Sequence, residues 1–185
     1  FVLMAIPFFI LAGELMNASG ITKKIVNLSN ALVGRMKGGL GHVNIVANVI
    51  FATMSGAAVA AVAGLGTILI PSMEESGYDK SYACALTASA SVIGPTIPPS
   101  IPMVVCASTA GISVAAMFAG GIFPGLLLAV LMMVLNGIIS SRRGYQLHGQ
   151  TYKGTIGDVI KDGIIALGMP AIIFVGILGG VFTAT

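Results

Sequence analysis

The amino-acid sequence predicts an all-α membrane protein, and three observations lead to that prediction. Only 8% of the 185 residues are charged, against about 25% in an ordinary soluble domain. The few charges are clustered, and they leave charge-free windows at residues 38–73, 81–141 and 163–185. Small residues or prolines interrupt the first two of these windows. The composition excludes a cytosolic enzyme, a nucleic-acid-binding protein and a secreted disulfide scaffold, and it predicts a chain that crosses the lipid bilayer.

Residues 1–37 are predicted to form the end of a transmembrane helix followed by an amphipathic helix at the cytoplasmic membrane surface. The apolar segment 1–16 lacks the basic start and the cleavage site of a signal peptide. In residues 17–37, lysines and arginines alternate with apolar residues at helical spacing, which is typical of a helix lying in the interface. Because the sequence starts and ends within apolar runs, we expect it to be a piece of a longer polypeptide.

Residues 38–73 predict a re-entrant helical hairpin. Small and hydroxyl residues, ATMSGAAVA, occupy the middle of this charge-free window and are flanked by short apolar arms. Short arms favour a hairpin whose tip stops inside the membrane, where non-helical backbone is tolerated only if protein or a polar cavity surrounds it. Two ordinary membrane-spanning helices, joined by a small-residue turn outside the membrane, are the alternative for this segment.

Residues 74–110 predict a polar loop followed by a transmembrane helix that is broken by prolines. The polar loop begins at Pro71. Further along the chain, residues 94–102 (GPTIPPSIP) contain four of its eight prolines. Pro98 and Pro99 cannot continue a helix, because each lacks an N–H group and disfavours helical geometry in the residue before it. A broken helix that follows a re-entrant hairpin is the pattern that indicates a transporter binding site.

The rest of the chain is predicted to cross the membrane once and to begin a second crossing. Residues 111–141 form a conventional transmembrane helix with Gly121 and Gly125 spaced for close helix packing. Residues 142–162 form a polar loop, and residues 163–185 begin the next helix. All nine lysines and arginines then fall on one side of the membrane, which the positive-inside rule identifies as cytoplasmic.

The chemistry available to these segments is that of exposed backbone rather than of catalytic side chains. No metalloprotease, P-loop or nucleophile-elbow motif occurs in the sequence, and we expect no enzymatic activity. Helices that end at Thr53–Gly56 and at Gly94–Ser100 leave carbonyl groups that attract cations and N–H groups that attract carboxylates. Hydroxyl groups at these positions add uncharged oxygen ligands, which suit Na⁺. The alternative is that the hydroxyls only bond to carbonyls of the preceding helical turn.

Three segments of the sequence resemble a known family. They are AIPFFILAGELMNASGI, ATMSGAAVAAVAGLGTILIPSMEESGYDKSYACALTASASVIGPTIPPSIPM and AGISVAAMFAGGIFPGLLL, and the ending GGVFTAT is similar to a further family motif. Together they resemble the large membrane (M) subunit of tripartite ATP-independent periplasmic (TRAP) transporters. Full members of this family are more than twice as long, so the resemblance implies the first structural repeat and the start of the second.

The resemblance implies an inverted-repeat fold with an elevator-type transport domain, in which 41–73 matches the first re-entrant hairpin and 81–106 the broken helix. It implies Na⁺-coupled secondary active import of organic acids, such as dicarboxylates or sialic acid, across the bacterial inner membrane. The implied partners are a periplasmic substrate-binding (P) protein and a small membrane (Q) subunit, besides the lipid bilayer. No cofactor other than the coupling ion Na⁺ and no nucleic acid is expected.

The site residues follow from the resemblance by position. The cation would be held, largely through carbonyl groups, by Ser55, Gly56, Ala57, Gly94, Pro95 and Pro98, and the substrate by Thr53 and Ser100. The chain departs from the family pattern at three positions. Ala57 stands where members commonly have serine, Ala61 where they have aspartate, and Ala184 where they have proline. The second hairpin of the family is absent from this sequence.

Two other functions fit the same sequence features. One is a dicarboxylate/Na⁺ symporter of similar architecture that needs no binding protein, and the other is a structural membrane subunit that transports nothing. The sequence names neither the substrate nor the oligomeric state and stoichiometry.

Overall fold

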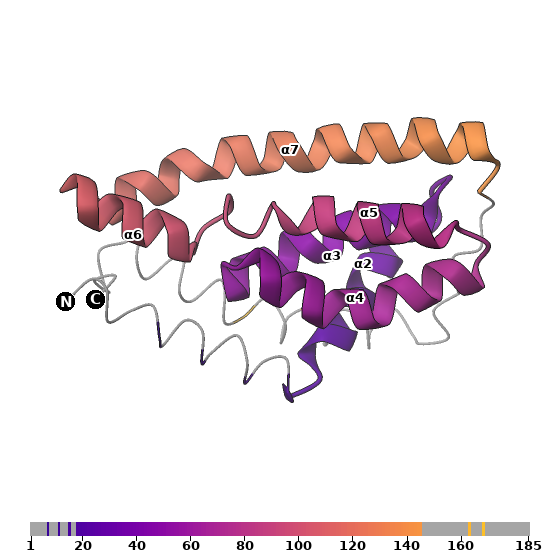
Figure 1. Cartoon of the computed structure of the whole chain (residues 1–185), viewed down its shortest axis with the longest axis horizontal. Coiled ribbons are helices and arrows are strands. Elements are labelled where there is room, and N and C mark those ends of the chain that lie inside the picture. The colour runs from indigo at the N-terminus through magenta and orange to yellow at the C-terminus, as the bar shows by residue number, and fades with distance from the viewer. Residues whose placement is uncertain are drawn as a thin grey trace.

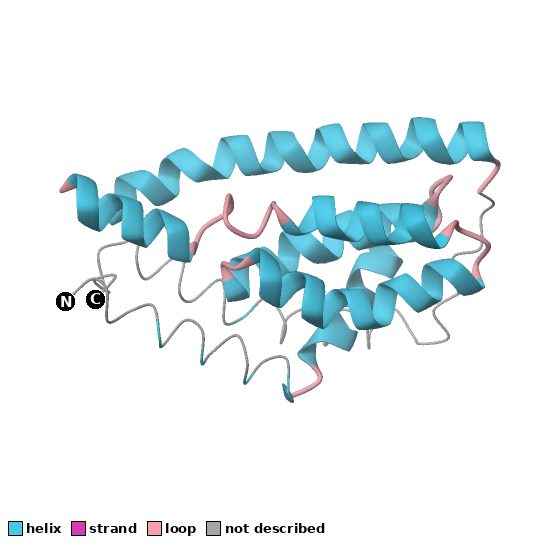
Figure 2. Cartoon of the chain, in the orientation of Figure 1, coloured by secondary structure: helices cyan, strands magenta, loops and turns pink. Residues whose placement is uncertain are grey.

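The computed structural model of the chain describes residues 18–145, together with Pro7, Leu11, Leu15, Gly163 and Gly168. Within these residues all regular secondary structure is α-helical (Figures 1 and 2), which confirms the predicted all-α class for this part. The helices are α2 (Ile21–Val33), α3 (Gly39–Ser55), α4 (Ala58–Glu75), α5 (Lys80–Ser91), α6 (Ile101–Ala110) and α7 (Val114–Arg143). The predicted helix within 1–16, most of the loop 142–162 and the helix expected at 163–185 fall largely outside the described residues.

Helix α2 lies in the segment predicted as an amphipathic helix. It begins after Gly20 and ends before Gly34. One face is buried against α3 and α4 through Ile25, which has no exposed surface, whereas Lys23 on the opposite face is exposed. This division of apolar and charged faces fixes which side of α2 meets the hairpin.

Helices α3 and α4 form a hairpin that reverses at two residues. Gly56 ends α3 with φ 57° and donates its N–H to the carbonyl of Ala52 at 3.1 Å. Ala57, with φ −134°, is extended and starts α4. Glycine is required at position 56 because side-chain-bearing residues rarely adopt a left-handed conformation. The two arms pack through a shared apolar cluster that includes Val43, Phe51 and Leu65.

Helix α4 is longer than the sequence indicates. The polar loop expected from Pro71 starts only after Glu75, because the helix continues through the proline. A proline inside a helix costs about 3 kcal/mol through one lost hydrogen bond and a steric clash. Leu69 and Met73, on either side of Pro71, are fully buried, and this tertiary packing holds the helix together. The connection to α5 is therefore confined to residues 76–79, where Asp79 accepts a hydrogen bond from the Ser81 N–H at 2.7 Å.

A nine-residue connection at 92–100 separates α5 from α6. The chain leaves α5 through a turn in which the N–H groups of Gly94 and Ile97 bond to the carbonyls of Ser91 and Ile93, each at 2.9 Å. Pro98 and Pro99 follow, and Ser100 caps the start of α6. The connection between the two helices thus contains Pro95, Pro98 and Pro99.

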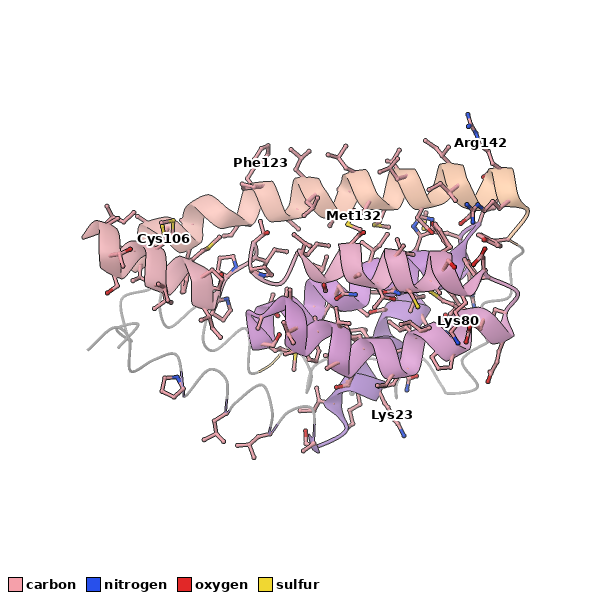
Figure 3. All side chains as sticks on the ribbon, viewed as in Figure 1. Lys23, Lys80, Cys106, Phe123, Met132 and Arg142 are labelled. Atoms are coloured by element: carbon pink, nitrogen blue, oxygen red, sulfur yellow. The ribbon has the colours of Figure 1, made fainter. Side chains whose placement is uncertain are left out.

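Helix α7 runs for 30 residues along α3 and α6, which at 1.5 Å per residue is about 45 Å. Figure 3 shows Phe123 pointing away from the other helices, and this side chain is 75% exposed. Many other large apolar side chains of α7 are also exposed. Helices α4 and α7 are both long and apolar enough to cross a membrane, which agrees with the predicted membrane protein.

Candidate functional site

The hairpin tip and the α5–α6 connection lie directly against each other (Figure 2). A Cβ atom added at Gly56 would lie 3.1 Å from the Cα of Ser100, and closer still to the carbonyl oxygen of Pro99. A Cβ added at Gly94 would lie 3.4 Å and 3.5 Å from the carbonyl carbon and oxygen of Ala57. The two segments therefore meet main chain to main chain, and the absence of a side chain at Gly56 permits the closest part of this approach.

Four helix ends converge at this contact. The C-terminal ends of α3 and α5 bring carbonyl groups, and the N-terminal end of α4 brings N–H groups. The start of α6 lies here too, but Pro102 has no N–H and the Met103 N–H is bonded to Ser100 Oγ. The last four carbonyls and the first four N–H groups of a helix have no intrahelical partner. Carbonyl ends carry partial negative charge and N–H ends partial positive charge. The contact thus offers ligands for a cation and for an anion side by side, without any ionised side chain.

The N-terminus of α4 lacks a side-chain cap, because Ala57 is its N-cap residue and has no polar side-chain atom. An N-cap serine, threonine, asparagine or aspartate would normally accept a hydrogen bond from one of the first N–H groups. At α4 these N–H groups are left for water or for a ligand.

The hydroxyl groups of the hairpin tip bond to their own helix. Thr53 donates to the carbonyl of Ile50 at 2.6 Å, and Ser55 donates to that of Phe51 at 3.4 Å. This is the arrangement that the alternative interpretation of these residues expects. A hydroxyl that donates its proton keeps its lone pairs, so both oxygens can still bind a cation.

Ser100 differs from the other hydroxyl residues because it connects two elements. Its Oγ donates to the carbonyl of Pro95 at 2.7 Å and accepts a hydrogen bond from the N–H of Met103 at 3.3 Å. The residue is 1% exposed. Ser100 therefore caps α6 and holds the proline-containing connection in place at the tip.

The predicted site residues are distributed unevenly over this contact. Gly56 and Ala57 from the tip meet Gly94 and Ser100 from the connection. Pro95 is linked to the contact through the Ser100 hydroxyl. The other three predicted residues lie next to these in the chain or one turn away: Ser55 and Pro98, both buried, and Thr53, which is half-buried.

Ala61 lies one turn beyond the contact along α4 and donates its N–H to the carbonyl of Ala57 at 3.2 Å. It is fully buried among the apolar side chains of the α2–α3–α4 cluster. A carboxylate at this position would have to be buried in apolar surroundings, which is costly for an unpaired charge. Among the described residues, no group of three histidine, cysteine or acidic side chains could hold a metal ion. Cation binding here would depend on carbonyl and hydroxyl oxygens, the ligands that hard cations prefer.

A buried polar network, not singled out by the sequence analysis, ties α3 to α5. Asn44 Nδ2 donates to Thr87 Oγ1 at 2.7 Å, and Asn48 Nδ2 donates to Asn44 Oδ1 at 2.9 Å. Thr87 in turn donates to the carbonyl of Ala83 at 2.8 Å. Both asparagines are at most 1% exposed. The signal that could have revealed them is a pair of asparagines four residues apart inside a charge-free window.

Helix α7 supports the proline-containing connection from the side opposite the tip. A Cβ added at Gly121 would lie 2.8 Å from the carbonyl oxygen of Thr96 and 3.0 Å from Met103 Sδ. At Gly125 it would lie 3.3 Å from Ile97 Cδ1 and closer to Cγ1 of the same residue. The close packing predicted for the two glycines is confirmed, and its partner is the α5–α6 segment.

Comparisons with known proteins place these features in a family. The family model described as "Tripartite ATP-independent periplasmic transporter, DctM component" matches residues 1–185. The sialic acid TRAP transporter large permease protein SiaM of Vibrio cholerae is 42% identical over 185 residues, which are 100% of this chain and 43% of that protein. The 2,3-diketo-L-gulonate TRAP transporter large permease protein YiaN of Escherichia coli is 40% identical, and this chain covers 44% of it.

A third relative has a different named substrate. The C4-dicarboxylate TRAP transporter large permease protein DctM of Vibrio cholerae is 38% identical over 187 residues, and the whole chain covers 41% of that protein. The chain thus spans less than half the length of these curated relatives.

Proposed function

Because the chain belongs to the DctM component family of tripartite ATP-independent periplasmic transporters, we propose that it is part of the permease subunit of a Na⁺-coupled importer of organic acids. Its relatives are transporter permeases, not enzymes. The observation that supports ion-coupled transport most directly is the contact between the hairpin tip and the α5–α6 connection. This contact assembles opposite helix ends at one point, as a cation and a carboxylate bound together would need.

The Na⁺ ion occupies the carbonyl side of this contact. In the proposal, carbonyl oxygens of Ser55, Gly56 and Ala57 at the hairpin tip and of Gly94, Pro95 and Pro98 in the α5–α6 connection hold the ion. The substrate carboxylate occupies the N–H side, at the start of α4, with Thr53 and Ser100 next to it. The second hairpin, which the resemblance implies in the rest of the polypeptide, completes the substrate site.

The helix lengths support a broken transmembrane helix. Helix α5 has 12 residues and α6 has 10, so they reach about 18 Å and 15 Å at 1.5 Å per residue. Neither can cross a hydrocarbon core of about 30 Å alone, but the two in succession can. The connection at 92–100 then lies near the middle of the bilayer, and the hairpin tip that touches it lies at the same depth.

The same placement makes α3–α4 a re-entrant hairpin in one half of an inverted repeat, and an elevator motion would carry it with α5 and α6. A tripartite system implies two further proteins, a periplasmic binding protein and a small membrane subunit, at the bacterial inner membrane. The substrates named for the relatives, sialic acid and C4-dicarboxylates, are carboxylates, which is the chemistry that free helix N-termini bind.

The test is uptake in proteoliposomes that contain the full-length permease and its small subunit. Labelled sialic acid or a C4-dicarboxylate is added with the matched binding protein, under an inward Na⁺ gradient or an equal K⁺ gradient. We expect uptake only when both Na⁺ and the binding protein are present. Equal uptake without the binding protein would favour the independent symporter. Absence of uptake for every carboxylate tested, with the protein folded, would favour a structural subunit.

A further inference from the structure

A cavity lies between the start of α3 and the C-terminal half of α7, apart from the contact between the hairpin tip and the α5–α6 connection. Its volume is about 810 Å³. The residues that line it and carry the argument are Lys37, His42, Val130, Val134, Gly137 and Arg142. The proposed transport function does not involve this cavity.

One end of the cavity is basic. Lys37 precedes α3 and Arg142 belongs to the last turn of α7 (Figure 3), and both side chains are exposed. Within residues 18–145, neither side chain makes an ion pair with an acidic residue. All the residues described around the cavity are apolar, neutral or basic. Among the described residues, no acidic side chain balances the positive charge at this end, which therefore favours an anion.

A buried histidine supplies an unsatisfied polar atom in the same wall. His42 is 3% exposed, and its Nδ1 has no hydrogen-bond partner. The Lys37 main chain lies near the ring but outside hydrogen-bond geometry for Nδ1. A buried polar atom without a partner is destabilising, and Nδ1 itself is closed off from the open cavity.

The other part of the cavity is apolar and elongated. From Arg142 to Val130 the lining follows α7 for 12 residues, which is about 18 Å at 1.5 Å per residue. Gly137 lies opposite His42 in this wall, and its missing side chain widens the cavity there. A Cβ added at Gly137 would lie 3.9 Å from both Cε1 and Nε2 of the ring. A ligand that fits has one anionic end and one long apolar chain.

We propose that this cavity binds an anionic phospholipid, with its phosphate at Lys37 and Arg142 near His42 and one acyl chain along α7 toward Val130. Charge complementarity favours this occupant, since basic pockets between transmembrane helices on the cytoplasmic side bind anionic headgroups. The basic end of the cavity is on the side that the positive-inside rule identifies as cytoplasmic. A wholly apolar helix from another subunit would leave both cations without partners.

The test is native mass spectrometry of the full-length permease in detergent with phosphatidylglycerol or phosphatidylcholine of the same acyl chains. A basic residue next to anionic lipid contributes a factor of about five in affinity, so two contribute about 30-fold. We expect wild type to retain phosphatidylglycerol in preference to phosphatidylcholine. The double variant Lys37→Gln with Arg142→Gln should lose that preference. The matched control, Lys23→Gln with Arg35→Gln, removes the same charge from exposed positions outside the cavity and should keep it.

A second pair of variants tests the acyl-chain part without changing charge. Gly137→Leu should lower phosphatidylglycerol retention by filling the wall, whereas Gly120→Leu, which faces open space on the same helix, should not. The lipid assignment is overturned if both double variants lose the preference equally, or if wild type binds the two lipids equally. It is also overturned if glycerol phosphate alone competes as well as the intact lipid, or if Gly137→Leu retains phosphatidylglycerol fully.

Discussion

The main-chain contact at Gly56 predicts that a single methyl group there will impair both folding and ion binding. The change is Gly56→Ala, and the matched control is Gly111→Ala. Both glycines end a helix with positive φ, 57° at Gly56 and 66° at Gly111. A Cβ at Gly111 has no atom within 4 Å outside its own neighbours, whereas a Cβ at Gly56 meets the backbone of Pro99 and Ser100.

The expected magnitudes follow from these two environments. A left-handed conformation costs a side-chain-bearing residue about 1–2 kcal/mol, and both variants lose this amount. Only Gly56→Ala also forces an atom against fixed main chain, for which overpacking typically costs about 1–3 kcal/mol more. Since about 1.4 kcal/mol is tenfold in an equilibrium constant, the added cost separates the variants by about fivefold to 150-fold.

The assay combines thermal unfolding of the full-length permease in detergent with Na⁺ titration of uptake in proteoliposomes. Gly111→Ala should lower the unfolding temperature modestly and leave the Na⁺ concentration for half-maximal uptake unchanged. Gly56→Ala should lower the unfolding temperature further and raise that Na⁺ concentration, because the tip is pushed away from the connection. The larger Gly56→Val should abolish uptake while the protein still inserts into the membrane.

Equal effects of the two alanine variants would refute this reasoning. The outcome would mean that Gly56 serves only its own helix end, and that the approach to Pro99 and Ser100 contributes nothing to stability. Normal Na⁺ dependence in Gly56→Val would in addition place the ion elsewhere in the protein.

Three further predictions concern the surroundings of the site. The double-mutant cycle of Asn44→Ala and Thr87→Val should show a coupling free energy of about 0.6–1.7 kcal/mol in unfolding measurements, and strictly additive effects would contradict the 2.7 Å bond. Gly121→Ala should lower the unfolding temperature, because it places a methyl group against the Thr96 carbonyl at a cost of about 1–3 kcal/mol. Gly120→Ala adds its methyl group in open space and should not lower it. Equal stability of the two variants would contradict this packing. Ser100→Ala should cost about 1 kcal/mol in unfolding free energy through the lost cap and should reduce uptake. Ser100→Thr keeps the hydroxyl and should restore much of both. Equal loss of function in the two variants would contradict a role for the hydroxyl group.

The elements around the site could be predicted from the sequence because glycine and proline act locally. Gly56 requires a left-handed turn, and Pro98–Pro99 removes the N–H groups that a helix needs. Both interruptions therefore stand where the residues place them. Their contact with each other could not be derived from the residues alone, since it depends on how α3, α4 and α5 pack.

Two features depended on tertiary packing and were not predicted. A proline usually indicates a helix end, but at Pro71 the burial of Leu69 and Met73 outweighs the cost of a proline inside the helix. The spacing of Asn44 and Asn48 indicates a polar pair in a charge-free window, but their partner becomes clear only when α5 brings Thr87 within 2.7 Å of Asn44. Local residue preferences predict a helix break only where packing does not oppose it, and polar partners across an interface require the folded arrangement.

The contact of main chain with main chain has a consequence for how this protein can diverge. Backbone carbonyl and N–H groups are the same whichever amino acid is encoded, so replacing Ala57 alters the surroundings of the candidate ion site but not its carbonyl ligands. Codon changes at Gly56 differ, because any side chain there meets the main chain of Pro99 and Ser100. In the proposed function, related permeases can therefore change their substrates through side chains elsewhere and keep the same main-chain contact. We expect deep mutational scanning to show tolerance at Ala57 beside intolerance at its neighbour Gly56.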